Sequence, residues 1–246
     1  MITWGVNMSK LNYETLRQDF NVHGMTYIDN FLDKADFIKI SNLWNHTKYF
    51  EAKKQEDKSA YGNEFRHTIV KHFSNGTEGY VTDFKWPDKN EIYKCNFSES
   101  KVVPKMKDVT TLVKNLIQPI AESIMSKHLK ASQIHANIYK KNGDNFSRAH
   151  SDGSSFFTPI GFIYYVNKLQ WKYDWGGLLH YLNPVDNGVD TILPISNRVV
   201  FINHGYDLKH WITPVCTWAR EDRKTLTGMF EEKGQWEYYD ELGNVL

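Results

Sequence analysis

Cysteine is scarce in this sequence. The chain has two cysteines, Cys95 and Cys216, which lie far apart and in no metal-binding spacing. A disulfide scaffold is therefore not expected. The sequence favours a reducing, intracellular setting, which we take to be cytoplasmic.

Long apolar runs are also missing. No stretch is long and apolar enough to span a bilayer, so no membrane association is expected. Residues 1–8 have neither a basic leader nor an apolar core, and therefore do not resemble a signal peptide. Met8 is an alternative start to Met1.

A charge excess of either sign is absent. The 30 basic and 29 acidic residues give a net charge of +1, which provides no bulk attraction to nucleic acid. Apolar residues make up 41% of the 246 residues, which is enough for a core, and no internal repeat divides the chain. We expect a single domain over residues 1–246 and no nucleic-acid partner. The sequence does not indicate an oligomeric state.

The N-terminal half predicts a mixture of helix and strand. Residues 23–32 predict a short strand that leads into a turn, and residues 33–44 predict a helix. The pattern between residues 50 and 100 assigns no element. Residues 1–130 are therefore expected to form a helical and mixed region that supports the rest of the chain.

The clearest helical pattern lies within residues 105–129. Apolar residues recur there at spacings of three and four from Val109 to Met125, which predicts a helix with one face packed against a sheet. Pro119 lies inside this pattern and is expected to kink or divide the helix.

After residue 130 the pattern changes to short strands broken by turns. Such strands without intervening helices predict a sandwich or barrel, so the fold class is mainly β with N-terminal helices. The expected β core covers residues 131–232, and residues 233–246 form a tail. The predicted strands cover residues 133–140, 158–167, 177–182, 198–203 and 225–230.

One short motif carries metal chemistry. Among ten histidines only His150 begins a His-x-Asp, with Asp152 as the acidic residue. Residues two apart on a strand point the same way, so both side chains can reach one metal ion. A second histidine would complete a 2-His-1-carboxylate site, which leaves positions open on Fe(II). His180, His204 and His210 all lie downstream, and spacing does not choose among them.

Five further segments occur in order after the His-x-Asp. Together with it they resemble the landmarks of 2-oxoglutarate oxygenases of the prolyl-hydroxylase type, especially the hypoxia-factor prolyl hydroxylases, over about residues 131–230. A weaker resemblance covers Met25 to Leu32. The segments are Ile163–Asn167 (IYYVN), Gly176–Leu178 (GGL), Asn197–Ile202 (NRVVFI), His210–Pro214 (HWITP) and Arg223–Phe230 (RKTLTGMF).

The resemblance implies a fold and a reaction. The fold is a double-stranded β-helix, or jelly roll, supported by α-helices, with the metal at its open mouth. The cofactors are Fe(II), the co-substrate 2-oxoglutarate and O2, with ascorbate as a candidate reductant. The reaction converts 2-oxoglutarate to succinate and CO2 while a C–H bond is hydroxylated. The substrate is a small molecule or a peptide, such as a prolyl residue, a free amino acid or a metabolite.

The resemblance also assigns the metal ligands. It selects His210 as the partner of His150 and Asp152. It makes His204 a loop residue and His180 an ordinary strand histidine.

The same resemblance assigns the co-substrate pocket. Arg223 matches the basic residue on the final strand, whose guanidinium would bind the distal carboxylate of 2-oxoglutarate through two parallel hydrogen bonds. The interval from His210 to Arg223 is a few residues longer than in the family, so Arg220 stays a rival. Tyr165 and Tyr139 resemble pocket tyrosines, and Thr225 shares a strand face with Arg223.

Three alternatives remain at this point. Related halogenases lack the carboxylate ligand, whereas Asp152 is present and favours hydroxylation. Oxidative nucleic-acid demethylases carry another arginine six residues after the first, where this chain has Met229. A non-catalytic jelly-roll binding or sensor protein would usually have lost part of the triad or the arginine, and this sequence retains both.

Overall fold

The helices lie in the N-terminal half of the chain. The computed structural model describes residues 11–45, 51–54, 69–72, 78–81, 91–96, 107–143, 145–152, 159–206 and 208–232, so the predicted tail at 233–246 lies outside this range. No helix in these ranges is long and apolar enough to cross a membrane. The helices are α1 (Tyr13–His23), α2 (Lys34–Asn42), α3 (Lys107–Leu112) and α4 (Gln118–Met125), with a π-helical turn at Val113–Ile117 and 3-10 turns at Leu43–Asn45, Tyr173–Trp175 and His204–Tyr206.

The strands form two large antiparallel sheets and a separate hairpin. One sheet has the order β1-β11-β8-β13-β6-β5-β2, the second has the order β10-β9-β12-β7, and β3 pairs with β4. Their bounds are β1 (Met25–Ile28), β2 (Glu51–Lys54), β3 (Ile69–His72), β4 (Glu78–Val81), β5 (Glu91–Asn96), β6 (Leu129–Tyr139), β7 (Ser147–His150), β8 (Ile160–Tyr165), β9 (Leu179–Leu182), β10 (Val189–Ile192), β11 (Val199–Asn203), β12 (His210–Ile212) and β13 (Arg223–Glu232).

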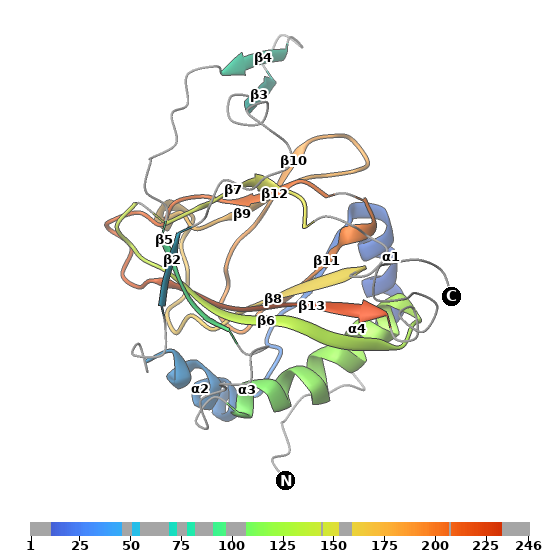
Figure 1. Ribbon diagram of the computed structural model, residues 1–246. Coiled ribbons are helices and arrows are strands. Elements are labelled where there is room, and N and C mark those ends of the chain that lie inside the picture. The colour runs from blue at the N-terminus through green and yellow to red at the C-terminus, as the bar shows by residue number, and fades with distance from the viewer. Residues whose placement is uncertain are drawn as a thin grey trace, which may run out of the picture.

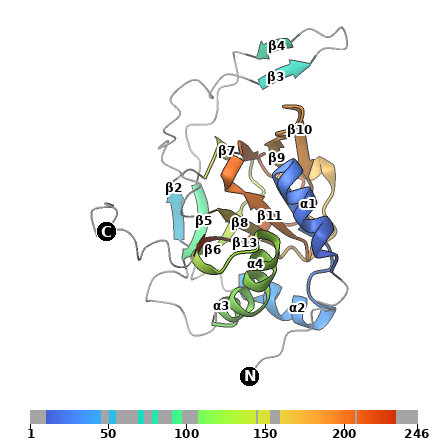
Figure 2. The same cartoon turned by 90° about the vertical axis from the view of Figure 1, so that its right-hand side faces the viewer.

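The molecule has three layers. In Figure 1 the four-stranded sheet lies above the seven-stranded sheet, and α2, α3 and α4 lie below the seven-stranded sheet. Figure 2, turned by a quarter, shows α1 beside the ends of both sheets. The predicted class, mainly β with supporting N-terminal helices, is confirmed.

The seven-stranded sheet has a hydrophobic core on each of its two faces. All residues of β8 are buried, because the seven-stranded sheet is covered on both faces. Phe162 and Tyr164 pack in the core that includes the helices, whereas Ile163 and Tyr165 pack between the sheets with Leu179 of β9. Side chains of a strand alternate between faces, so β1, β6, β8 and β11 each supply residues to both cores.

The helix predicted within residues 105–129 is divided. A π-helical turn at Val113–Ile117 separates α3 from α4, and Pro119 lies in the first turn of α4. The helix ends at Met125, the last residue of the apolar pattern. Ser126 takes a left-handed conformation with φ of 55°, and β6 begins at Leu129.

Helix α1 was not predicted from the sequence. Its first turn is capped by the Asn12 side chain, which accepts a hydrogen bond from Thr15 N at 3.2 Å. Its end is set by Gly24, whose left-handed φ of 75° lets its N–H donate to Phe20 O. Only Leu16 and Phe20 of this helix are buried, so its apolar pattern is too sparse to be recognised.

Asn197 provides a test of the fold. Its Oδ1 accepts hydrogen bonds from Leu32 N at 2.9 Å and Tyr164 OH at 2.8 Å, and its Nδ2 donates to Leu32 O at 2.7 Å. Replacing Asn197 by alanine should lower the free energy of unfolding by about 2–4 kcal/mol, because buried partners lose their bonds. Urea unfolding measures this loss. Asn187, which has a similar φ of 57° but is exposed, is the matched control, and its replacement by alanine should cost about 1 kcal/mol. Equal losses at both positions would contradict a clamping role for Asn197.

Candidate active site

His150 and His210 face each other on neighbouring strands. His150 ends β7, and it pairs directly with His210 at the start of β12. Directly opposite residues of an antiparallel pair project to the same side, which explains why their ring centroids are only 4.5 Å apart. The sheet register therefore brings together two histidines that are far apart in the sequence.

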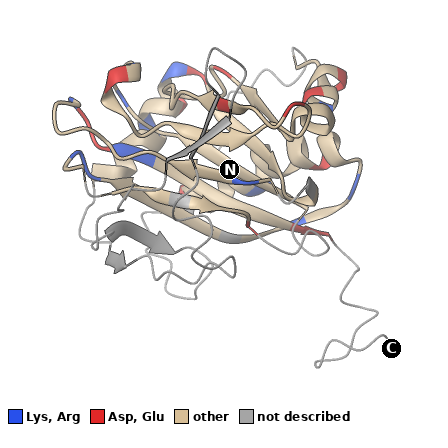
Figure 3. Ribbon diagram, turned by 90° about the horizontal axis from the view of Figure 1, so that it is seen from above, with Lys and Arg blue, Asp and Glu red and all other residues tan. Residues whose placement is uncertain are grey.

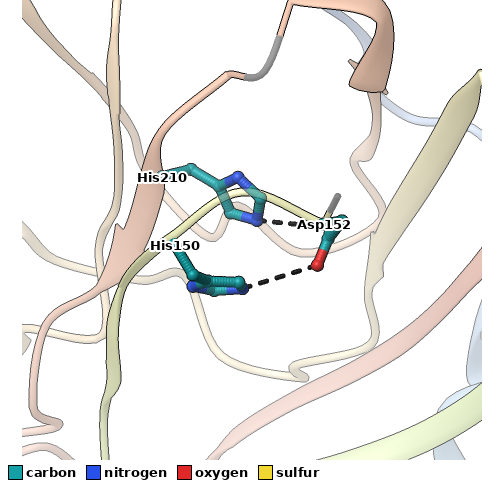
Figure 4. Close-up of side chains that lie close together, drawn as sticks. All are labelled: His150, Asp152 and His210. Atoms are coloured by element: carbon teal, nitrogen blue, oxygen red, sulfur yellow. Dashed lines mark ion pairs between the residues drawn. The ribbon is translucent and has the colours of Figure 1, made fainter. Parts of the chain in front are cut away.

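Asp152 completes a compact group with the two histidines (Figure 4). It lies two residues beyond the end of β7. Its Oδ1 is 3.5 Å from His150 Nε2, and its Oδ2 is 3.4 Å from His210 Nε2. The ligand atoms of the three residues all lie within 4.8 Å of one another. Two imidazole nitrogens and one carboxylate oxygen are a donor set that suits Fe(II) and leaves other coordination positions open.

The protonation of the group also suits a cation. His210 Nδ1 lies 3.0 Å from Leu208 O. A carbonyl can only accept, so Nδ1 donates to it and Nε2 is the nitrogen that faces Asp152. Burial alone would raise the pKa of Asp152, but the charge of His210 and contacts with His150, His204 and His210 outweigh it and hold that pKa well below its ordinary value. The carboxylate is therefore ionised, as a metal ligand must be.

His204 lies closer to this group than the sequence indicated. It occupies the loop after β11, as predicted, but it is buried and its Nε2 lies 3.3 Å from Asp152 Oδ2. Sequence reasoning gave it no role. The only available signal was its place one residue after the end of an apolar strand that leads toward His210. His180, the other histidine considered, lies on β9 with Nδ1 2.7 Å from Thr191 Oγ1.

Arg223 and Thr225 lie on the strand that β6 and β8 flank. Arg223 is directly opposite Tyr139 of β6, and Thr225 is directly opposite Tyr165 of β8. Both tyrosines belong to the core between the two sheets. The loop before β9 packs on the same arginine, since a Cβ on Gly177 would lie 3.1 Å from Arg223 Cδ. Three adjacent strands and one loop thus surround the guanidinium, and we refer to these residues as the Arg223 pocket.

The polar groups of this pocket are buried without partners. Arg223 is 1% exposed, and its guanidinium carbon lies 4.9 Å from the Tyr139 ring centroid and 5.1 Å from that of Tyr165. Within the part of the chain that the structure describes, Nε and Nη2 of Arg223, the Tyr165 hydroxyl and the Thr225 hydroxyl have no hydrogen-bond partner. Native proteins rarely leave buried charged donors unmatched. These groups could hold an anion such as a carboxylate.

The tyrosine hydroxyls can serve as donors to that anion. Burial raises the pKa of Tyr139 to about 12, although the charge of Arg223 opposes the rise and that of Asp152 adds to it. Burial raises the pKa of Tyr165 in the same way. Both phenols stay protonated at neutral pH.

Arg220, the rival of Arg223, is exposed at the surface. A second hollow of the molecule is a groove of about 690 Å³ between α1, β1 and the β9–β10 hairpin, and its lining includes Asp19 and Asp190. None of the His–Asp–His residues and none of the Arg223 pocket residues line that groove.

Comparison with known proteins agrees with this geometry. The sequence profile of the 2OG-Fe(II) oxygenase superfamily matches residues 134–231, which include all the residues of both sites. Residues 134–231 belong to the 2OG-Fe(II) oxygenase superfamily. The chain is therefore an oxygenase, an enzyme of the dioxygenase class that uses Fe(II), 2-oxoglutarate and O2. No curated protein matches the sequence.

Solved structures share the fold of this oxygenase at low identity. A Pseudomonas putida prolyl-4-hydroxylase is 16% identical with a TM-score of 0.57, covering 90% of this chain and 100% of that one. A Trichoplax adhaerens prolyl hydroxylase in complex with a hypoxia-inducible-factor peptide fragment is 14% identical with a TM-score of 0.59, covering 90% and 89%. The α-ketoglutarate-dependent epimerase SnoN from nogalamycin biosynthesis is 12% identical with a TM-score of 0.59, covering 89% and 82%. The stacked sheets are therefore the double-stranded β-helix that the resemblance implied.

Proposed function

We propose that this oxygenase hydroxylates an unactivated C–H bond and converts 2-oxoglutarate to succinate and CO2. In this proposal His150, Asp152 and His210 hold Fe(II). Arg223 anchors the co-substrate, assisted by Tyr165, Thr225 and Tyr139. The observation that carries the proposal is the presence, in one fold, of a compact His–Asp–His group and of a buried guanidinium whose Nε and Nη2 have no hydrogen-bond partner among the described residues.

The protein groups have distinct tasks in this reaction. Iron and 2-oxoglutarate, when bound, supply the oxidising chemistry, and the protein orients the reactants. The guanidinium of Arg223 would hold the distal carboxylate of the co-substrate, and the Tyr165 and Thr225 hydroxyls would donate to the same carboxylate. The apolar core between the sheets, which includes Trp171 and Leu179, excludes water from the back of the pocket.

We propose a peptide or a small molecule as the primary substrate. The structural neighbours include one protein solved with a bound peptide and one epimerase from a biosynthetic route, so the fold accepts both kinds. Basic and acidic residues are intermixed over the face seen from above in Figure 3, which gives little attraction to a polyanion. A prolyl residue, a free amino acid and a small metabolite all fit this expectation.

Succinate production tests the proposal. The purified chain is incubated with Fe(II), 2-oxoglutarate and O2, with and without a chelator, against prolyl peptides, free amino acids and metabolites. Iron-dependent succinate that increases with one substrate, together with gain of one oxygen atom in that substrate, is the expected result. Tight 2-oxoglutarate binding without any succinate under all conditions would contradict the proposed reaction.

A further inference from the structure

His204 is a buried histidine for which the proposed function has no use. It begins the 3-10 turn His204–Tyr206, directly after β11 of the seven-stranded sheet. Asp152 follows β7 of the four-stranded sheet. The contact of 3.3 Å between His204 Nε2 and Asp152 Oδ2 therefore connects the two sheets at the metal group.

The fold reserves space for the His204 ring. A Cβ on Gly161 of β8 would lie 2.7 Å from His204 Nε2 and 2.8 Å from its Cε1, which real Cβ atoms essentially never do. The backbone fixes the same approach, because His204 N donates to Pro159 O at 3.1 Å. Gly161 interrupts a buried strand in which Ile160, Phe162 and Ile163 fill the neighbouring positions. The imidazole of His204 occupies the space that a side chain at position 161 would fill.

The contact involves one oxygen of the carboxylate. Asp152 Oδ2 lies 3.3 Å from His204 and 3.4 Å from His210, whereas Oδ1 lies 3.5 Å from His150. His204 is not one of the three residues whose ligand atoms all lie within 4.8 Å of one another. It therefore contacts the carboxylate without joining the metal group itself. A carboxylate held on one oxygen has fewer orientations open to it, and such outer contacts tune metal affinity.

We propose that His204 is a positioning residue that holds the Asp152 carboxylate in its metal-binding orientation, with Gly161 providing the space for its ring. The proposal rests on the proposed function, since it takes the His–Asp–His group to be the iron site. The ring is confined by β8, so the effect on Asp152 is transmitted from the rigid seven-stranded sheet.

Binding of Mn(II) and Co(II) to the full-length, metal-free protein tests this role without turnover. Replacing His204 by alanine should weaken Mn(II) binding by about 10- to 100-fold in titration calorimetry and should change the visible spectrum of the Co(II) form. His204→Gln should recover most of the affinity, because its amide keeps a donor nitrogen on a side chain of similar reach. Gly161→Ala should weaken binding by displacing the ring. His180→Ala is the matched control and should change nothing, because His180 contacts Thr191 instead of Asp152.

The outcomes separate the two proposals. A wild-type protein that binds neither ion contradicts the proposed function itself. Wild-type binding with unchanged affinity and Co(II) spectrum in His204→Ala overturns the positioning role alone. If His204→Ala loses Mn(II) affinity as completely as His210→Ala, and His204→Gln recovers none of it, then His204 is a metal ligand. That outcome also overturns the positioning role. If His204→Ala does not fold, His204→Gln and Gly161→Ala decide: wild-type affinity and spectrum in a folded Gly161→Ala protein would overturn the proposal.

Discussion

Replacing His210 by alanine is expected to abolish succinate production and to weaken Mn(II) binding by more than about 100-fold, because even the contacts around a metal ligand are worth about 10- to 100-fold. The same loss is expected for His150→Ala and Asp152→Ala. His210 contributes one of the three donors of the group and is buried beside Asp152. Calorimetry on the metal-free protein and a succinate assay measure the two effects.

His180→Ala is the control for these variants. His180 lies on β9 directly opposite Trp211 of β12, one residue along from His210, and its ring packs at 5.4 Å from that tryptophan. Neighbouring residues of a strand point to opposite faces, so His180 lies in the same sheet as His150 and His210 but points away from the metal group. It should retain both metal binding and turnover. Full activity in His210→Ala would refute the metal assignment.

The C-terminal half of the fold could be predicted because its strands carry a strong signal. β8 and β11 are buried along their whole length, so they stand out as apolar runs. β10 has only one buried residue, Ile192, and lies at the edge of its sheet, and it was not predicted. Its alternation of apolar and polar residues is too weak to distinguish this strand from a loop in the sequence. Residues 50–100, where no element was assigned, lie largely outside the described part of the chain.

The metal group could be predicted only in part from residue spacing. His150 and Asp152 are close in sequence, and a two-residue interval suffices to pair them. His210 joins them through the β7–β12 register, which spacing alone does not report, and only the family resemblance selected it. The contact of His204 depends on a glycine in another strand, Gly161, so neither spacing nor the resemblance indicated it. Contacts between sheets are set by three-dimensional packing, and one sequence carries little trace of them.

Burial distinguishes Arg223 from Arg220, which the sequence alone left as rival candidates for the co-substrate anchor. Arg220 and Arg223 are three residues apart in one charged turn. The structure places Arg220 at the surface and Arg223 at 1% exposure, opposite Tyr139 on the neighbouring strand. A charge that is taken out of water without a partner is costly. Burial of Arg223 carries this free-energy cost, and a bound carboxylate would offset it.

Replacing Arg223 by alanine should therefore raise the dissociation constant for 2-oxoglutarate by at least about 30-fold, since truncating one partner of a buried charge pair costs about 2–5 kcal/mol. Mn(II) binding in the absence of the co-substrate should stay near the wild-type value, because Arg223 is not part of the His–Asp–His group. Titration of 2-oxoglutarate into the Mn(II)-loaded protein, without O2, measures the affinity directly.

Three further variants decide whether the affinity for 2-oxoglutarate depends on the charge of Arg223, on the shape of its side chain or on its position. Arg223→Met fills the space between Tyr139 and Tyr165 without the charge and should lose as much affinity as Arg223→Ala. Arg223→Lys should recover part of the loss, because it restores the charge but not the planar pair of donors. Arg220→Ala should leave the affinity unchanged, since that side chain is solvated. If Arg220→Ala carries the large loss instead, the co-substrate is held at the surface turn, and the unpartnered groups of Arg223, Tyr165 and Thr225 must serve another anion.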